Sequence, residues 1–288
     1  MAATVRIGTC SWADDGLLRT WYPRGVSTAE KRLRYYAERF DTVEVDSPFY
    51  ALPDPDVTRR WAERTPDEFV FHVKAGAGMT GHEGEPTDEA FRSFRASVEP
   101  LELSGKLRGI LLQYHPRFTK TREALAELER IPERIAPLVP LVEFRHRSWM
   151  EEDARADTLA FLERTRLAYV SVDSPRTRAS NVMPRIAAAT HRVAYIRFHG
   201  RNAQTWNIRG ATSAADRFDW LYSAEELAEW VGHVQRLADE AEEVYALFNN
   251  NRDDFAPRSA AIFRGLLDEA GVSASGGIEP PASELRLF

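Results

Sequence analysis

Ionisable and polar side chains recur two residues apart inside short apolar segments of this sequence. The pairs are Glu44/Asp46, His72/Lys74, Glu143/Arg145, Ser171/Asp173 and Arg197/His199. Residues two apart on a β-strand share a face, so each pair predicts a strand with one polar and one apolar side. Charged groups are costly to bury unless they are paired or hydrogen-bonded. Their density favours a functional site, and a structural lattice of ion pairs is the alternative.

The residue types in these pairs are suited to proton transfer. Carboxylates beside cations and a half-buried imidazole can hold different pKa values, as general acids and bases require. The predicted catalytic residues are Glu44, Glu143, Asp173 and His199. Lys74 is interpreted as an electrostatic group or an ion-pair partner, with a Schiff-base nucleophile as the alternative. Which carboxylate is acid and which is base stays open.

A metal site is the weaker interpretation of the same residues. Hard divalent cations bind carboxylate and amide oxygens, which the pairs supply. The sequence has no HExxH, no calcium-loop motif and no histidines at ligand spacing. We therefore assign no metal ligand, and the cofactor stays unknown with a divalent metal as the alternative.

Eight short segments rich in Val, Ile, Leu, Phe and Tyr predict the β-strands that position these groups. They are Val5–Thr9, Thr42–Asp46, Phe69–Lys74, Arg108–Gln113, Leu141–Arg145, Ala168–Asp173, Ala194–His199 and Val244–Phe248. Segments with helical spacing separate them. Alternating strands and helices indicate a parallel sheet, and eight such units predict one α/β domain, a closed (β/α)8 barrel over residues 1–271. All five polar pairs lie near the carboxyl ends of their strands, where such barrels carry their active sites.

Capping residues and one glycine-rich motif refine this arrangement. Ser27-x-x-Glu30 and Ser223-x-x-Glu226 fit the capping box that begins a helix. Gly76–Gly81 matches GxGxxG after a predicted strand, as a dinucleotide site requires, but His82–Pro86 delays the next helix to about Thr87. We interpret this segment as a loop of the barrel mouth.

The loops after the last two strands predict an anion site. They contain Arg197, Gly200 and Arg201, and then Asn249–Asn251. Arginine offers forked donors to an oxyanion and glycine allows close backbone approach. Loops at this position of a barrel are a frequent phosphate site. The alternative is that the asparagines only stabilise a turn.

Aromatic residues in the loops after the strands could line the mouth. They include Trp12 and Tyr50, whose rings suit stacking on a base or a sugar. Packing within the loops would explain them equally well. The predicted binding residues so far are therefore Lys74, Arg145, Arg197, Arg201, Asn249, Trp12 and Tyr50.

Composition limits the partners and the compartment. The net charge of −6 argues against a generally basic nucleic-acid binder, although a local basic cleft remains compatible with it. No stretch reaches the roughly 20 apolar residues of a membrane span, and the start of the sequence lacks a basic region followed by an apolar run. A single cysteine, Cys10, fits a reducing compartment. We expect a cytoplasmic protein without a membrane partner.

Motifs from Ile7 to about Leu267 resemble the YecE-like family, also called the domain of unknown function 72 family. They are IGTCSW, TVEVDSPFY, FVFHVKA, the glutamine of LLQYHP, VEFRHRSW, YIRFHGR, YSAEELAEW and LFNNN. The resemblance implies a TIM-barrel-like fold and a kinship with barrel enzymes that act on nucleic-acid phosphodiesters. It adds Gln113 to the binding residues. Two departures, Cys10-Ser11 in place of Ser-Gly and the inserted His115, predict a different mouth near the first and fourth strands.

The last residues suggest a separate partner. Residues 272–288 are rich in Gly, Pro and Ser and predict a flexible tail. Its end, Glu284–Phe288, is similar to the Gln-Leu-x-Leu-Phe peptides that dock on the bacterial sliding clamp, with Glu in place of Gln. A tail that folds back on its own barrel is the alternative.

The sequence thus supports two main functional hypotheses. The first is a hydrolase or lyase that acts on a phosphorylated small molecule or on single-stranded nucleic acid. The second is a protein that binds such a ligand without chemistry. In either case the C-terminal peptide could recruit it to the sliding clamp.

Overall fold

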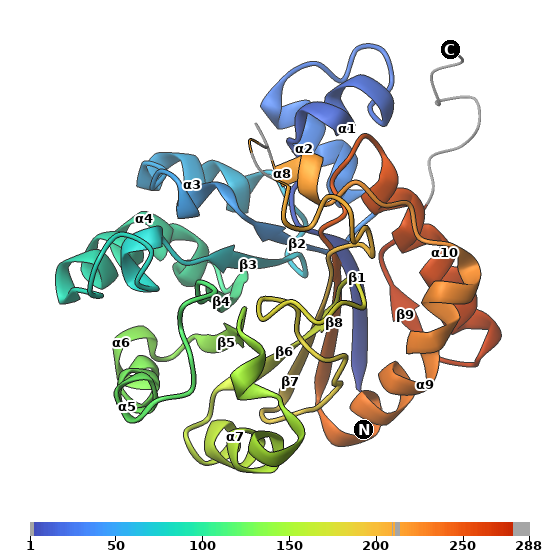
Figure 1. Ribbon diagram of the computed structural model, residues 1–288. Helices are drawn as coiled ribbons and strands as arrows, with labels where there is room; N and C mark the ends of the chain where they lie inside the picture. Colours follow the sequence, from blue (N-terminus) through green and yellow to red (C-terminus); the bar gives the residue numbers. More distant parts are fainter. Residues whose placement is uncertain (1–2, 209, 211–213, 279–288) are drawn as a thin grey trace.

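Eight parallel strands form a closed barrel at the centre of the molecule (Figure 1). The computed structural model describes residues 3–208, 210 and 214–278. The strands are β1 Thr4–Thr9, β2 Thr42–Val45, β3 Val70–Lys74, β4 Leu107–Gln113, β5 Val139–Glu143, β6 Ala168–Asp173, β7 Val193–Phe198 and β8 Glu243–Phe248. Each strand pairs with the next, and β1 pairs with both β8 and β2. The predicted (β/α)8 barrel, a TIM-like fold, is confirmed.

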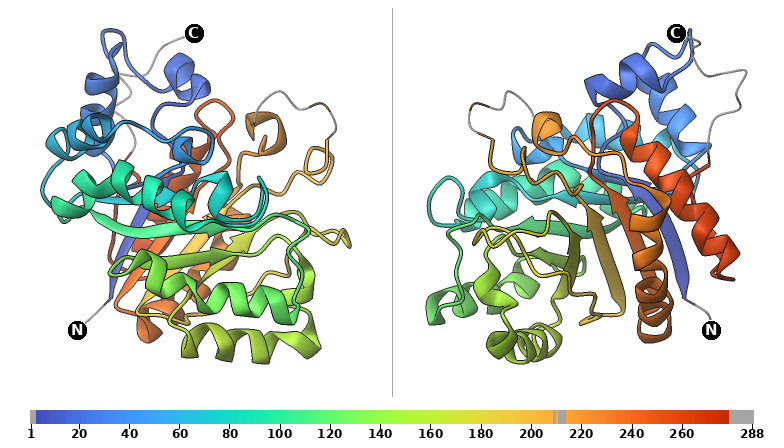
Figure 2. Two further views of the ribbon diagram at one scale, coloured as in Figure 1. Left: turned by 90° about the vertical axis from the view of Figure 1, so that its left-hand side faces the viewer. Right: turned by 45° about the vertical axis from the view of Figure 1, so that its right-hand side comes forward.

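Helices follow most strands and cover the outside of the barrel (Figure 2). The α-helices are α1 Asp15–Thr20, α2 Ala29–Ala37, α3 Pro55–Glu63, α4 Asp88–Leu103, α5 Arg122–Glu129, α6 Ile131–Ile135, α7 Glu152–Arg164, α8 Ala214–Arg217, α9 Ala224–Glu240 and α10 Phe255–Glu269. The 3-10 helices are η1 Ser47–Phe49, η2 Ala77–Met79 and η3 Arg147–Trp149. The connection from β6 to β7, residues 174–192, contains no helix. None of the helices described is both long and apolar enough to cross a membrane.

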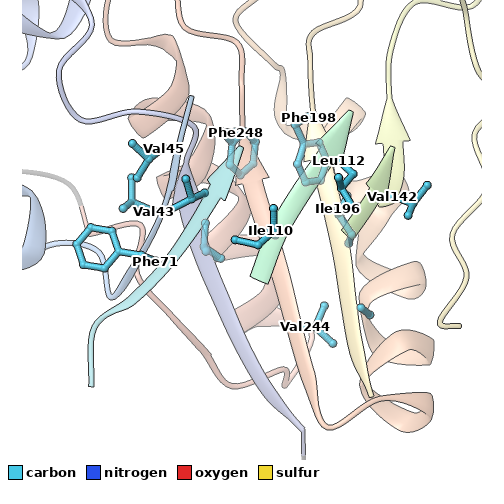
Figure 3. Packing of buried hydrophobic residues seen from close by; sticks show 14 of the residues in the cluster. Val43, Val45, Phe71, Ile110, Leu112, Val142, Ile196, Phe198, Val244 and Phe248 are labelled. Atoms are coloured by element: carbon cyan, nitrogen blue, oxygen red, sulfur yellow. The ribbon is translucent and has the colours of Figure 1, made fainter. Parts of the chain in front are cut away.

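The apolar face of each strand packs against these helices. Val43, Phe71, Ile110 and Ile196 are fully buried there, and Phe198 stacks on Phe248 with ring centroids 4.5 Å apart (Figure 3). Each such side chain contributes roughly 1.5–3 kcal/mol by leaving water. This layer holds the strands in place, so the opposite faces can carry groups that stabilise less.

The opposite faces fill the barrel interior with a second apolar cluster. Leu111, Leu141 and Tyr195 are among its fully buried members. His72 lies between Tyr195 and Tyr245, with ring centroids 4.9 and 4.3 Å away. Neither ring nitrogen of His72 has a hydrogen-bond partner within the described part of the chain, and burial lowers its pKa well below the usual value. His72 is therefore a neutral packing residue.

One of the two predicted capping boxes is present. At α9, Ser223 accepts from the amide of Glu226, whose carboxylate accepts from the amide of Ser223. At α2 the cap is Thr28, whose hydroxyl accepts from the amide of Lys31. The box predicted at Ser27 is wrong by one residue, because two adjacent hydroxyl residues can each serve as an N-cap and the sequence pattern does not choose between them.

Residues 272–278 stay on the barrel. Ala274–Ser275 forms a short strand, β9, that pairs with Val5 and Arg6 of β1. It lies where β1 and β2 separate, since among the described residues these strands pair only through Thr9 and Val43. Gly276 has φ +79°, and a Cβ there would lie 2.1 Å from the Ile7 carbonyl oxygen. The domain boundary predicted at 271 thus falls before this strand.

The predicted clamp peptide, Glu284–Phe288, lies outside the described residues. Recruitment to the sliding clamp stays a prediction.

Candidate anion-binding and catalytic site

A cavity of about 490 Å³ lies at the carboxyl ends of the strands, where the sequence predicted the site. Its volume falls within the roughly 300–1,000 Å³ of small-molecule sites. Its lining residues are Asp46, Phe49, Tyr50, Lys74, His82, Gln113, Pro116, Arg145, Asn181, Trp206, Arg217, Phe218 and Asn249. They come from the ends of seven strands, β2 to β8, and the loops that follow them.

A buried ion-pair network forms the floor below the cavity. Arg197 of β7 is fully buried and reaches across the barrel. It donates from Nη1 to Glu143 Oε2 on β5 at 2.6 Å and from Nη2 to Glu44 Oε1 on β2. Tyr195 donates to the other oxygen of Glu44 at 3.0 Å, and Arg145 pairs with Glu143. Removing one partner of a buried pair costs roughly 3–5 kcal/mol, so these residues form a rigid base.

His199 belongs to the same network. Its Nε2 lies 3.1 Å from Glu143 Oε1, and its Nδ1 lies 2.8 Å from Asn249 Nδ2. Its ring stacks on Phe218 with centroids 5.2 Å apart. Burial, together with the nearby Arg145, lowers the pKa of His199 to about 3. The imidazole is therefore neutral at pH 7, and its Nε2 also lies 3.1 Å from Arg145 Nη2.

The two buried glutamates have pKa values displaced in opposite directions. Burial would raise the pKa of Glu143, but Arg145, Arg197 and His199 together hold it well below its usual range. Burial raises the pKa of Glu44 above its usual range, with Arg197 opposing and Asp46 adding to the rise. Glu143 is thus a fixed anion, whereas Glu44 retains a proton more readily.

Asp46 connects Glu44 to the cavity. Its side chain is 26% exposed, and Arg197 Nη2 lies 3.7 Å away, beyond hydrogen-bond distance. The buried atom Asp46 Oδ1 lacks a donor among the described residues unless the Glu44 carboxyl beside it is protonated. Asp46 thus lies beside Glu44 on the cavity side, and its charge contributes to the raised pKa of Glu44.

Lys74 is a buried cation without a partner. It is 7% exposed, and its Nζ lies 4.3 Å from the ring centroid of Phe49. No hydrogen bond or ion pair joins it to any of residues 3–208, 210 and 214–278. Burial lowers the pKa of Lys74, and Asp46 opposes that shift. A buried ammonium is stable only when it is paired, so the cavity is prepared for an anion.

The sequence did not identify two further cavity residues, His82 and Arg217. His82 lies in the Gly76–Gly84 segment, where its Nδ1 is 2.9 Å from Thr80 Oγ1, and burial and the nearby His115 lower its pKa to about 4. This segment contains η2, and α4 begins only at Asp88 after the cap Thr87. The interpretation of the GxGxxG segment as a loop of the barrel mouth is confirmed. This interpretation was the one sequence feature that indicated a position of His82 near the cavity.

The predicted site residues fall into three groups. Five line the cavity: Lys74, Gln113, Arg145, Asn249 and Tyr50. Four lie in the network beneath it: Glu44, Glu143, Arg197 and His199. Asp173, Arg201 and Trp12 do neither.

Asp173 points outward from the barrel, contrary to the expectation. Trp230 donates to its Oδ2 and Tyr222 to its Oδ1, each at 2.7 Å, and Arg201 pairs with it at 2.9 Å. On β6, Val170 and Val172 face the interior, and alternation places Asp173 toward α9. β6 has one apolar face, with Val170 and Val172, and one polar face, with Asp173. The prediction assigned the polar face to the barrel interior, whereas the structure places the apolar face there. Arg201 is correspondingly part of this outer cluster.

Trp12 also differs from its prediction. It is 6% exposed and packs edge-on against Trp61 and Phe71, with centroids 5.3 and 6.4 Å apart. Loop position alone could not distinguish a stacking ring from a packed one. The rings that do line the cavity are Phe49, Tyr50, Trp206 and Phe218.

No three His, Cys, Asp or Glu side chains of the described ranges are grouped so that they could hold a metal ion.

A closed (β/α)8 barrel with a polar cavity at the carboxyl ends of its strands defines a TIM-barrel protein. Residues 6–283 match the family model described as protein of unknown function DUF72, and the chain belongs to this family. It is 32% identical over 271 residues to UPF0759 protein YunF of Bacillus subtilis, covering 92% of this chain and 95% of that protein.

Crystal structures of DUF72 family proteins share the fold. The protein from Enterococcus faecalis V583 superimposes with a TM-score of 0.81 at 27% identity, covering 96% of this chain and 99% of that one. The protein from Thermotoga maritima MSB8 gives a TM-score of 0.78 at 29% identity, covering 92% and 99%.

Proposed function

We propose that this protein is a hydrolase or lyase whose cavity binds the phosphate of a phosphorylated small molecule or of single-stranded nucleic acid. The observation that carries the proposal is Lys74, a buried ammonium that faces the cavity and makes no hydrogen bond or ion pair with the described residues. Arg217, another residue of the lining, also has no side-chain hydrogen bond or ion pair within the described residues. With Arg145, the cavity presents three cations and one carboxylate, Asp46.

The aromatic part of the lining supports a ligand with a flat or apolar portion. Tyr50 is 77% exposed at the rim, and Phe49, Trp206 and Phe218 lie deeper. Arg145 lies over the Trp206 ring, 5.6 Å from its centroid. Such rings bind a base or a sugar face through stacking and apolar contact. The cations would then hold the phosphate of the same molecule.

In this proposal Asp46 and Glu44 carry out the proton transfer. Asp46 reaches the cavity and can take a proton from an attacking water or from a substrate carbon. Glu44, which lies beside Asp46 and whose pKa is raised, can hold the second proton that the reaction needs. Glu143, Arg197 and His199 do not meet the substrate, and they orient the groups that do.

The first test is phosphate binding by the Lys74→Met variant. We expect inorganic phosphate, titrated calorimetrically, to bind at least about tenfold more weakly, equivalent to about 1.4 kcal/mol. The variant should also unfold at a higher temperature, because an unpaired buried charge has been removed. Lys31→Met, on exposed α2, is the matched control and should change neither property. A folded Lys74→Met protein with unchanged phosphate affinity would exclude this anion site.

The second test separates an enzyme from a binding protein. Phosphomonoester and phosphodiester probes, including a 5′-phosphorylated oligothymidylate, are screened for cleavage by the wild type and by Asp46→Asn. We expect turnover to be lost in Asp46→Asn while phosphate binding is retained or strengthened. If the wild type binds these probes and cleaves none, the non-catalytic alternative is favoured. The non-catalytic alternative is supported by the ion pairs that Glu44 and Glu143 form with Arg197. Asp46 is then the one carboxylate that faces the cavity among the described lining residues.

A further inference from the structure

A second hollow, of about 360 Å³, is lined by four arginines and no acidic residue. The arginines are Arg147, Arg176, Arg178 and Arg185, and the rest of the lining is Ser174, Pro175, Thr177, Val182, Met183 and Pro184. We call this hollow the arginine cleft. Its walls are the β6–β7 connection and η3 after β5.

The arginine cleft carries more positive charge than its neighbours neutralise. Glu229 of α9 is shared by Arg176 at 2.8 Å, by Arg201 at 3.2 Å and by Arg185. Asp173 is likewise shared by Arg201 and Arg185. Glu226 adds a third carboxylate, 3.7 Å from Arg201, and Arg147 pairs with Glu151 at 3.0 Å, so the excess positive charge comes from the fourth arginine of the cleft, Arg178.

Arg178 adds an unpaired cation. Its side chain is exposed and has no hydrogen-bond or ion-pair partner in the parts of the chain that the structure describes. Its backbone carbonyl accepts from Arg147 Nη1 at 3.2 Å, which fixes the loop against η3. A guanidinium presents forked donors that match a phosphate, and this one is free to use them.

The arginine cleft and the mouth cavity share one wall. Asn181 lines the cavity and the next residue, Val182, lines the cleft. Val182 packs in one small cluster with Trp206 and Phe218, which also line the cavity. Both hollows are built from residues that follow the carboxyl ends of strands. They are therefore neighbours at this end of the barrel, with Asn181 and Val182 between them.

We infer that the arginine cleft binds a second phosphate of the substrate whose first phosphate occupies the mouth cavity. The inference rests on the proposed function and narrows its substrate class to molecules with at least two phosphates. Phosphates joined along a single strand and phosphates at two ends of a small molecule supply the same chemistry. When one molecule carries both phosphates, binding of the first phosphate holds the second near the arginine cleft. The affinity of the whole ligand is therefore higher than that of a ligand with one phosphate.

The test compares ligands with one and two phosphates on the full-length protein. One pair of probes is thymidine 5′-monophosphate and a 5′-phosphorylated thymidine dinucleotide, and the other is fructose 6-phosphate and fructose 1,6-bisphosphate. We expect the two-phosphate member of at least one pair to bind at least about tenfold more tightly. The pair that shows this gain identifies the source of the second phosphate.

The Arg178→Met variant assigns that gain to the arginine cleft. It should reduce the tenfold gain to within about twofold and leave binding of the one-phosphate probe unchanged. Arg122→Met, at an exposed position of α5, is the matched control and should keep the gain. Two-phosphate probes that bind no better than one-phosphate probes, or equal behaviour of the two variants, would overturn the inference. Loss of one-phosphate binding in Lys74→Met reports on the mouth cavity separately, so failure of the proposed function is distinguishable.

Discussion

Lys74 shows how a single buried charge can prepare a site. An ammonium inside a protein is costly, and here its nearest compensation is the ring of Phe49 and the carboxylate of Asp46. A bound phosphate would supply the missing negative charge and restore the pKa that burial has lowered. Binding and protonation of Lys74 are therefore linked.

This linkage gives a pH dependence. Because the pKa of Lys74 is below its ordinary value of 10.5, the ammonium is fully present at lower pH and is lost as pH rises through the depressed pKa. We expect phosphate affinity to fall with rising pH already below pH 10.5, where phosphate itself keeps its charge. Lys74→Arg should flatten the decline, since a guanidinium stays protonated. Calorimetric titrations across this range test it, and parallel curves for the two proteins would contradict it.

Alternation along strands predicted much of the site at this scale. Glu44, Glu143, Arg197 and His199 were expected to share the barrel interior, and they form one network. Their depth could not be predicted, because it depends on how far each side chain reaches across the barrel. Lys74 and Asp46, the cation and the carboxylate that face the cavity, lie instead at the carboxyl ends of β3 and β2.

The bounds of the strands could be predicted from the sequence, whereas the course of the loops could not. All eight strands were placed to within two residues at each end, because apolar runs mark buried strands. The loops were not, since no periodic pattern fixes their direction. For this reason His82, Arg217 and the arginine cleft could not be anticipated, and Trp12 was assigned to the wrong surroundings.

The start of α2 allows a test at the scale of one helix. Thr28 is the N-cap, whereas the hydroxyl of Ser27 accepts no capping bond. We expect Thr28→Ala to lower the free energy of unfolding by about 1 kcal/mol. Ser27→Ala should change it by less than about 0.5 kcal/mol. Urea unfolding of both variants measures the difference, and a larger loss in Ser27→Ala would restore the cap expected from the sequence.

Closure of the barrel involves a ninth strand. β9 lies beside β1 where β2 has separated from it, and Ser275 donates to Asp41, the residue before β2. The composition of residues 272–288 concealed this strand, because Gly, Pro and Ser predict a tail. Here the glycines are needed for close approach between backbones.

Gly276 tests the contribution of this segment to the whole molecule. A Cβ at this position would collide with the Ile7 carbonyl, and the positive φ adds strain. We expect Gly276→Ala to lower the free energy of unfolding by about 1–3 kcal/mol. Gly232→Ala is the control, since Gly232 lies in α9 with nothing within 4 Å. It should be neutral or stabilising by about 0.5–1 kcal/mol. Equal effects of the two substitutions in thermal unfolding would show that the close approach of the β9 segment to β1 does not stabilise the protein.

The pairing of β1 with β8 and β9 also affects how the protein is made. A ribosome completes β1 first among the strands, whereas its partners emerge last: β8, which pairs with its full length, and β9, which pairs with Val5 and Arg6. Until then both margins of the growing sheet have unsatisfied peptide groups and an apolar face in water, the condition under which nascent chains associate with one another. A chaperone that shields the unfinished sheet during translation would therefore be expected to raise the yield of this protein.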